Sequence, residues 1–262
     1  MAVPGPTGLI MTPSTPESLL FQRGDRYQHH RPDYPTELFD WLAQRTPSRQ
    51  RALDMGCGSG QACRALESIF NEVLGADISV AQLRAAPAGN TGYLAARADS
   101  LPLPAASLDL ITVAQALHWF ALPAFFHEAG RVLREGGLLA ILSYGLCSVR
   151  GLEGLVERFH DDTLRPWWPA ARWLVVDGYK SIDLPWPEYT EQPAIVLRRQ
   201  WHWRDMAGYL DTWSALVKAR AHGQDPLAAF LPELQRHWGD REREVSWPLR
   251  LRCCARPAGA PA

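Results

Sequence analysis

Three alternate glycines stand out within a run of small and apolar residues. The run reads Ala-Leu-Asp54-Met-Gly56-Cys-Gly58-Ser-Gly60; its first half is typical of a buried strand, and the residues after it are typical of a helix. Glycine lacks a Cβ atom and adopts positive φ without strain, so a ligand can approach the backbone and the start of the helix. We therefore expect a binding loop here, with an ordinary glycine-rich turn as the alternative.

Acidic residues follow the next two expected strands. Asp77 comes 21 residues after Gly56, close to the spacing at which a carboxylate accepts hydrogen bonds from ribose hydroxyls. Asp99 follows the third strand, where it could accept the amino hydrogen of an adenine. The alternatives are a helix cap for Asp77 and a solvated turn acid for Asp99. With the glycine loop, the two acids predict a nucleoside site, to which we also assign Ile78 and Ser100.

The residues around the glycines favour a positively charged nucleoside. Gln61 stands where the dinucleotide fingerprint has a glycine or alanine, which disfavours NAD. No Gly-Lys-Ser/Thr follows the glycines, which excludes a P-loop. Asp54 would bring a carboxylate towards a pyrophosphate, whereas S-adenosylmethionine offers an amino group and a sulfonium, both cationic. The loop therefore favours S-adenosylmethionine.

Short apolar runs alternate with helical stretches, a pattern that predicts βαβ units and a parallel sheet. The expected strands are 52–55, 73–76, 93–96, 108–114 and 138–142. The expected helices between them are 61–70, 80–86 and 122–134, the last capped by Gly136-Gly137. A further helix begins after Pro35 and ends at Pro47. These elements predict a doubly wound core.

The alternation breaks beyond Tyr144, where prolines and tryptophans accumulate. We expect an inserted segment over about 146–194, and then a strand at 195–203, a helix at 206–221 and a strand at 245–254. Residues 1–24, rich in Pro, Gly, Thr and Ser, are expected to be a flexible leader. The rest, 25–262, is expected to be one domain, with its cofactor-binding core at 50–145 and its last two strands in 195–262.

The composition argues against nucleic-acid and membrane partners. Lys and Arg number 27 against 28 Asp and Glu, and they are scattered among the acids rather than gathered in a basic patch. No apolar run approaches the roughly 18 residues of a membrane span, and no secretory signal is recognisable. The five cysteines lack the spacing of a zinc site, so we expect them to be reduced and no metal to be bound. We expect a cytoplasmic monomer or homodimer.

The glycine loop, Asp77, Asp99 and the segment Arg131-Val-Leu-Arg-Glu-Gly-Gly137 together resemble the class I S-adenosylmethionine-dependent methyltransferases over roughly residues 50–145. The resemblance implies an α/β, Rossmann-like fold with a seven-stranded, mainly parallel sheet. Its last strand would be antiparallel, and an inserted helical cap would cover the site. The strands at 195–203 and 245–254 would be the sixth and seventh. The implied product of the cofactor is S-adenosylhomocysteine.

Three further segments resemble the methyltransferases that esterify trans-aconitate and cantharidin-type dicarboxylates. They are Tyr27 with Arg31-Pro-Asp-Tyr34-Pro, Gln115-Ala-Leu-His118-Trp119-Phe120, and Gly208-Tyr-Leu-Asp-Thr212-Trp213-Ser214-Ala. The resemblance implies that Tyr27 and Arg31 fold over the cofactor, with Arg31 facing its methionine carboxylate. An ion pair between Arg31 and Asp33 or Glu37 is the alternative. Gln115 and Ala116 would lie beside the transferred methyl group.

The acceptor is expected to be a small molecule, and a carboxylate is favoured. Methyl transfer from a sulfonium is an in-line displacement, in which the enzyme aligns the reactants. A carboxylate is already ionised at neutral pH, whereas a phenol, amine or carbon acid more often requires a base. His118 is the leading base or hydrogen-bond donor, with a structural histidine as the alternative.

Tryptophans and arginines supply further candidates for the acceptor pocket. Trp119 and Trp213 are expected to line it, while most of the 11 tryptophans should be core. Arg172, Arg198 and Arg199 could meet an acceptor carboxylate, although a solvated surface role is the simpler reading. Two other functions stay open: C- or N-methylation of a quinone or natural-product precursor, and a non-catalytic cofactor-binding homologue.

Overall fold

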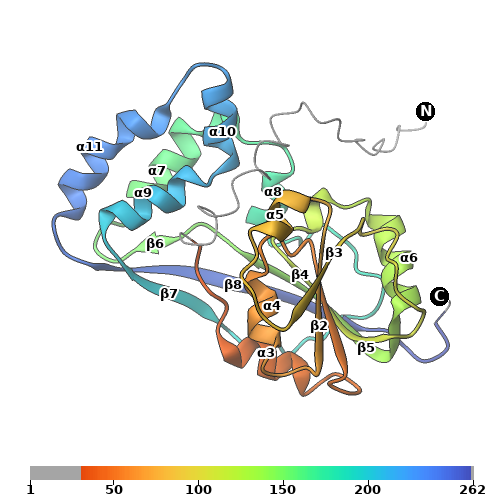
Figure 1. Cartoon of the computed structure of the whole chain (residues 1–262). Coiled ribbons are helices and arrows are strands. Elements are labelled where there is room, and N and C mark those ends of the chain that lie inside the picture. Colours follow the sequence, from red (N-terminus) through yellow and green to blue (C-terminus); the bar gives the residue numbers. More distant parts are fainter. Residues whose placement is uncertain (1–30, 261–262) are drawn as a thin grey trace.

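The computed structural model describes residues 31–260, and a mixed sheet runs through its whole length (Figure 1). The strand order is β3-β2-β1-β4-β5-β8-β6, with β7 also paired to β8. The strands are β1 Arg51–Met55, β2 Glu72–Asp77, β3 Thr91–Ala95, β4 Leu108–Ala114, β5 Leu133–Tyr144, β6 Ser148–Val149, β7 Val196–Trp201 and β8 Arg243–Ala255. The expected Rossmann-like α/β fold is confirmed, and the short β6 brings the described strands to eight.

The sheet is parallel from β3 to β5 and antiparallel around β8. The second half of β8, from Leu249 to Ala255, pairs with β5. Its first half, from Arg243 to Pro248, pairs with β7 and carries the sheet away from the parallel core. The antiparallel last strand is therefore confirmed, and the expected sixth strand is the partner of β8. One long strand thus joins the core to the helices at the far end.

Alternate residues of β5 belong to two apolar clusters, one on each face of the sheet. Leu138, Ala140 and Leu142 pack with the helices of the first face, and Leu139 and Ile141 pack on the second. Burial on both faces explains the nearly continuous apolar runs of the central strands. The five cysteines are all buried and unpaired, as expected of small hydrophobes.

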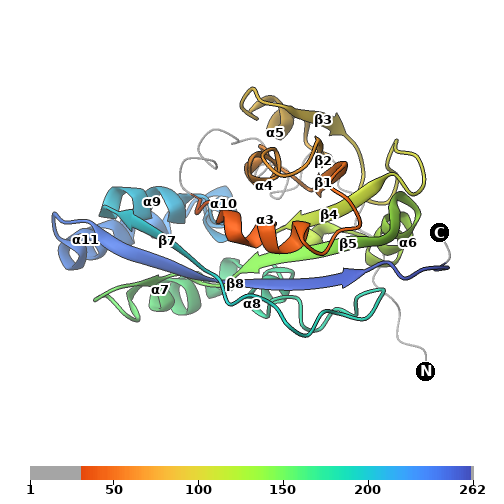
Figure 2. The same cartoon turned by 90° about the horizontal axis from the view of Figure 1, so that it is seen from below.

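Helices cover the sheet, and several of them gather at one end as a helical cap (Figures 1 and 2). The helices beside the parallel strands are α3 Thr36–Ala43, α4 Gln61–Leu66, α5 Val80–Arg84, η1 Leu117–Trp119 and α6 Leu122–Val132. The remaining helices are α7 Leu155–Arg158, η2 Phe159–Thr163, η3 Arg165–Trp167, α8 Arg172–Val176, α9 Trp203–Asp211, α10 Ser214–Ala221 and α11 Pro226–Trp238. The cap is built from two stretches of chain, because α9, α10 and α11 lie with α7. None of the helices in the described part of the chain is long and apolar enough to cross a membrane.

The prediction of a single helix at 206–221 is wrong, because the helix is interrupted at Thr212 and Trp213, between α9 and α10. The Tyr209 carbonyl accepts both the Thr212 hydroxyl, at 2.6 Å, and the Thr212 N–H, at 3.1 Å, while the Trp213 N–H donates to the Leu210 carbonyl. Trp213 then adopts an extended backbone, with φ −75° and ψ 133°, and its indole is 3% exposed. The free energy gained by burying this large ring outweighs the local preference for a continuous helix. The sequence analysis also missed α11, which begins at Pro226 with Asp225 as its N-cap.

The helix cap expected at Gly136-Gly137 is also wrong. The helix α6 ends at Val132, and Leu133 pairs at once with Leu108 of β4. The two glycines lie inside β5, where the register shifts between Leu108 and Leu110, and Gly136 has φ +74°. The glycines therefore permit a bulge in a strand rather than the end of a helix. The expected leader at 1–24 lies outside the described residues.

Candidate functional site

The three glycines of the loop after β1 all have positive φ, between 54° and 80°, but they serve different purposes. A Cβ on Gly56 would lie 2.6 Å from the Cβ of Ala116, and one on Gly60 would overlap the Tyr93 hydroxyl. A Cβ on Gly58 would meet only the Gln82 side-chain oxygen, at 3.9 Å. Gly56 and Gly60 are therefore required by packing, whereas Gly58 presents bare backbone to open space.

Asp77, at the carboxyl end of β2, is bonded to the glycine loop. Its carboxylate accepts hydrogen bonds from the Gly58 N–H at 2.9 Å and the Ser79 N–H at 2.8 Å. The cap of α5 is Ser79, whose hydroxyl accepts from the Gln82 N–H at 3.3 Å. Burial raises the pKa of Asp77, against the effect of these hydrogen bonds. A carboxylate has about four acceptor positions, so Asp77 can still accept bonds from a ligand.

The edge beside Asp77 combines an apolar surface with a free acceptor atom. Ile78 is 59% exposed directly after β2, which is unusual for a large hydrophobic side chain. Gln82 is buried, and its side-chain oxygen has no hydrogen-bond partner in the described range. An apolar face, an unused acceptor and bare backbone together fit a purine nucleoside. Gln82 was missed by the sequence analysis, since a glutamine in a short helix gives no signal.

Asp99 and Ser100 lie in the turn after β3. The Arg97 guanidinium donates to both carboxylate oxygens of Asp99, at 2.9 and 2.7 Å, and holds the pKa of Asp99 below its usual range. Ser100 is exposed, and its N–H donates to the Arg97 carbonyl. The structure thus gives Asp99 a local partner, and its contact with an adenine stays a prediction.

Asp54 lies beneath the glycine loop and is 1% exposed. The Thr112 hydroxyl donates to its carboxylate at 2.7 Å, and the Cys63 thiol lies at 3.8 Å. Burial raises the pKa of Asp54 from 3.8 to about 7, although these two hydrogen bonds oppose the rise. A buried acid of this kind would be stabilised in its charged form by a nearby cation.

The end of β4 turns sharply towards the glycine loop. Gln115 has φ +59°, a strained conformation for a side chain that is not glycine, and its N–H donates to the Leu142 carbonyl at 2.9 Å. The next residue, Ala116, is buried against Gly56. The turn thus brings Ala116 to the glycine loop, and the position of Gln115 and Ala116 beside the transferred methyl group stays a prediction.

Arg31 lies over the carboxyl end of β5. Its guanidinium donates to the Tyr144 hydroxyl at 3.1 Å and lies 5.2 Å from the centre of the Tyr209 ring. Asp33, which was considered as its partner, is paired with Arg199. Tyr27 falls outside the described residues. Arg31 is thus placed at the same sheet edge as the glycine loop.

His118 is in η1, and its Nδ1 is 2.9 Å from the Tyr179 hydroxyl. Burial, with a smaller contribution from the positive charge of Arg172, lowers the pKa of His118 from 6.5 to about 3. The imidazole is therefore neutral at pH 7 and a weak base. The Trp119 ring lies beside it, with centroids 4.6 Å apart, and is 36% exposed.

Trp213 lies in an aromatic cluster of the cap. The cluster comprises Trp213 and four rings whose centroids lie 5.4 to 6.4 Å from that of Trp213: Phe159, His160, Trp168 and Tyr209. The Trp247 indole donates to the Tyr209 hydroxyl at 3.0 Å and ties the cluster to β8. Trp213 is therefore a core residue of the cap in this structure, and its contact with an acceptor stays a prediction.

Arg172, Tyr144 and Tyr179 join the site although sequence reasoning gave them little weight. The helix α8, which begins at Arg172, packs against both η1 and β5. The charges of Arg172 and Arg31 both act on the buried Tyr209. No local pattern marks these residues, because one ends β5, one begins the short helix α8 and one lies in a turn. We call Arg31, His118, Tyr144, Arg172 and Tyr179 the polar cluster.

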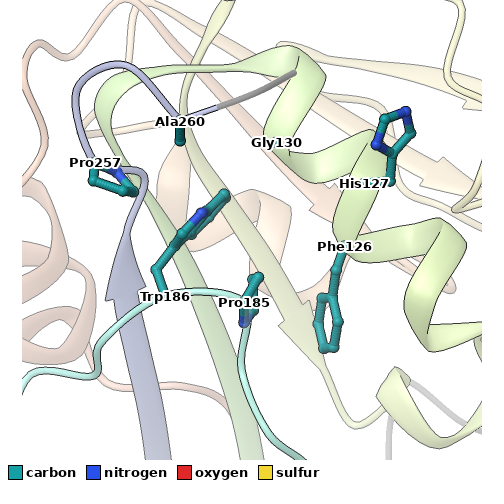
Figure 3. Close-up of a pocket in the computed structure, with 7 residues that line it drawn as sticks. All are labelled: Phe126, His127, Gly130, Pro185, Trp186, Pro257 and Ala260. Atoms are coloured by element: carbon teal, nitrogen blue, oxygen red, sulfur yellow. The ribbon is translucent and has the colours of Figure 1, made fainter.

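A separate hollow contains none of these residues (Figure 3). It is lined by Phe126, His127, Gly130, Pro185, Trp186, Pro257 and Ala260. The C-terminal segment meets the start of β5 here, through the hydrogen bond from Gly136 N–H to the Arg256 carbonyl. Ligands of open α/β sheets bind outside the carboxyl ends of the strands. This hollow lies near the start of β5, at the amino ends, and is therefore not the expected ligand site.

Comparison with known proteins gives one consistent result. Residues 53–141 match the model of a methyltransferase domain. A provisionally named methyltransferase from Dictyostelium discoideum is 36% identical over 222 residues, which are 81% of this chain and 84% of that protein. The 27-O-demethylrifamycin SV methyltransferase of Amycolatopsis mediterranei is 34% identical over 142 residues, 48% of this chain and 51% of that one. A solved structure, provisionally named a type II methyltransferase from Anaeromyxobacter dehalogenans, is 39% identical with a TM-score of 0.79, over 87% and 98% of the two chains.

The different environments of the glycines predict the effect of Gly58→Ala. The variant should lose about 1–2 kcal/mol of unfolding free energy, the usual strain of alanine at positive φ. Its affinity for S-adenosylhomocysteine, measured by calorimetry, should fall at least roughly tenfold, because the new methyl group projects into the open space. The matched control is Gly223→Ala, where φ is +75° and nothing lies within 4 Å of the added Cβ. Equal affinities of the two variants would contradict a ligand at Gly58.

Asp54 predicts an unusual dependence of stability on pH. The unfolded chain releases this proton near pH 3.8 and the folded chain only near pH 7, so Asp54 weakens folding increasingly between these values. The unfolding free energy of Asp54→Asn, relative to the wild type, should therefore rise by up to about 4 kcal/mol from pH 4 to pH 8. Urea denaturation of the ligand-free proteins at both pH values measures the difference. A constant difference would show that Asp54 is ionised throughout.

Proposed function

Since the chain belongs to the class I S-adenosylmethionine-dependent methyltransferases, we propose that it transfers a methyl group to a carboxylate of a small molecule. The family gives the cofactor and the reaction type. The acceptor is inferred from the electrostatics of the polar cluster. The location of the protein in the cytoplasm and its monomeric or homodimeric state stay predictions.

The residues at the sheet edge fit the cofactor. Gly58 offers bare backbone, Asp77 retains acceptor positions for ribose hydroxyls, and Ile78 offers an apolar face to the adenine. Arg31 would pair with the methionine carboxylate, and the buried acid Asp54 suits a cationic ligand. When bound, S-adenosylmethionine supplies a methyl group that a carboxylate oxygen takes as the carbon–sulfur bond breaks, which leaves S-adenosylhomocysteine.

The acceptor class rests on the position of His118, which lies near Arg172 with its Nδ1 2.9 Å from the Tyr179 hydroxyl, where burial lowers its pKa. An imidazole with a pKa of about 3 cannot take a proton from a phenol or alcohol effectively near neutral pH. A carboxylate reaches the site already ionised and needs no base. His118 would then donate a hydrogen bond or position the acceptor, held by its contact with the Tyr179 hydroxyl. Gln115 and Ala116 would shape the place where the two reactants meet.

The Amycolatopsis relative favours a second candidate. Its name specifies O-methylation of a natural product, so a hydroxyl acceptor is the alternative for this chain. Such an acceptor would require a base that the low pKa of His118 does not provide. Methylation at nitrogen or carbon is disfavoured for the same reason.

Incubation with labelled S-adenosylmethionine and a panel of small carboxylic acids, phenols, amines and alcohols tests the proposal. We expect methyl esters of one or more acids, identified by mass spectrometry and by their release of methanol in alkali. The phenols, amines and alcohols should give no product. Product from these compounds, and none from any acid, would replace the proposal with the hydroxyl or C/N-methylation alternative.

His118→Ala should reduce kcat for the preferred acid by less than about tenfold, because loss of a general base typically costs a factor of a hundred or more. The pH dependence of kcat between pH 5 and 8 should be unchanged, since the imidazole stays neutral over that range. Steady-state kinetics of the wild type, His118→Ala and His118→Gln measure both effects. A thousandfold loss, together with loss of an inflection near pH 6.5, would make His118 a base.

A further inference from the structure

Arg172 is placed where the cap meets the parallel core. The helix α8 begins at Arg172 and lies between the cap helices and the core (Figures 1 and 2). It packs against η1, which carries His118, and against β5, which ends at Tyr144. Arg172 therefore lies near the carboxyl edge of the sheet, within electrostatic reach of Tyr144 and His118.

Among residues 31–260, the guanidinium of Arg172 has aromatic and cationic neighbours and no acidic partner. It lies 4.9 Å from the centre of the Trp168 ring. Its Nε is buried and has no hydrogen-bond partner within residues 31–260. The groups whose charges act on it are Tyr209, Arg31, Tyr144 and Tyr179, and burial lowers its pKa. No carboxylate of the described residues forms an ion pair with Arg172.

Other arginines in the structure contrast with this one. Arg131 pairs with Glu128, Arg134 with Asp109 and Arg220 with Asp211, at distances of 2.5 to 2.7 Å. A desolvated cation without an anion destabilises a folded protein. Such a group is retained where a ligand completes it, and the planar guanidinium fork matches a carboxylate.

We propose that Arg172 anchors a second, non-reacting carboxylate of the methyl acceptor and so determines which acids the enzyme accepts. The inference rests on the proposed function and adds to it a specificity-determining residue. The carboxylate bound to Arg172 is not the one methylated, because a guanidinium that binds both oxygens withdraws the electron density that attack on the methyl group requires. The reacting carboxylate lies instead beside His118, Gln115 and Ala116.

The neighbours of Arg172 support this division of roles. The Tyr179 hydroxyl, which contacts His118, and the Tyr144 hydroxyl, which accepts from Arg31, are both close enough to interact with Arg172. Phenolic hydroxyls can donate to the outer oxygens of a carboxylate. Arg31 and Arg172 would thus bind two different anions, the cofactor's carboxylate and the acceptor's.

The experiment compares the wild type, Arg172→Met, Arg172→Lys and the control Arg165→Met, all saturated with S-adenosylhomocysteine. Arg165 is exposed in η3 of the same cap. Calorimetric titration with succinate, glutarate and isophthalate gives the affinity of each protein, and propionate serves as the single-carboxylate control. We expect Arg172→Met to lose about 10–100-fold in affinity for the tightest dicarboxylate. Arg172→Lys should lose less, and Arg165→Met nothing.

Thermal melting of the ligand-free proteins separates an anchor from a structural residue. Removal of an unpaired buried cation should leave the melting temperature of Arg172→Met unchanged or raised. A clearly lower melting temperature with unchanged dicarboxylate affinity would overturn the proposal, as would a wild type that binds none of the three diacids. A wild type that binds a diacid through Arg172 but forms no ester from any acid would contradict only the proposed function. Ester formation with an unchanged KM in Arg172→Met would contradict only the anchor.

Discussion

The hydrogen bond from the Gly58 N–H to the Asp77 carboxylate is the interaction on which the ligand edge depends. It joins the loop after β1 to the end of β2, and it forms because Gly58 adopts positive φ. The same loop receives the end of β4, since Gly56 leaves just enough room for Ala116. Three neighbouring strands thus deliver their carboxyl ends to one place, which is how an open parallel sheet makes a binding site.

Around this edge two ionisable groups are buried without an ion pair to any residue in the range 31–260. Asp54 lies beneath the loop with its pKa raised to about 7, and Arg172 lies near His118 without an acidic partner among the described residues. A sulfonium and a carboxylate would satisfy these two groups respectively. Methyl transfer would remove the sulfonium charge while the carboxylate at Arg172 stayed ionised, so the product of the cofactor would be held less well beside Asp54 than the cofactor itself.

The construction of the cap depends on aromatic packing. The helix is interrupted at Trp213, whose ring is buried in the aromatic cluster. Tyr209 of the same cluster accepts a hydrogen bond from Trp247 of β8. Because Arg31 and Arg172 lie over rings of this cluster, packing of the cap sets the positions of both guanidinium groups. The long strand β8 holds the cap against the core, because its second half pairs with β5.

The sequence by itself determined the parallel core, the glycine loop, Asp77 and the family, because these depend on local patterns of apolar residues and on backbone that only glycine permits. It misassigned Gly136 and the helix at 206–221, where strand pairing and the burial of Trp213 outweigh local propensity. Only the tertiary structure placed Arg172 beside His118, with no carboxylate of the described part of the chain paired to it. Burial of a side chain and its lack of an ion-pair partner depend on residues that are far apart along the chain and meet only in the folded protein.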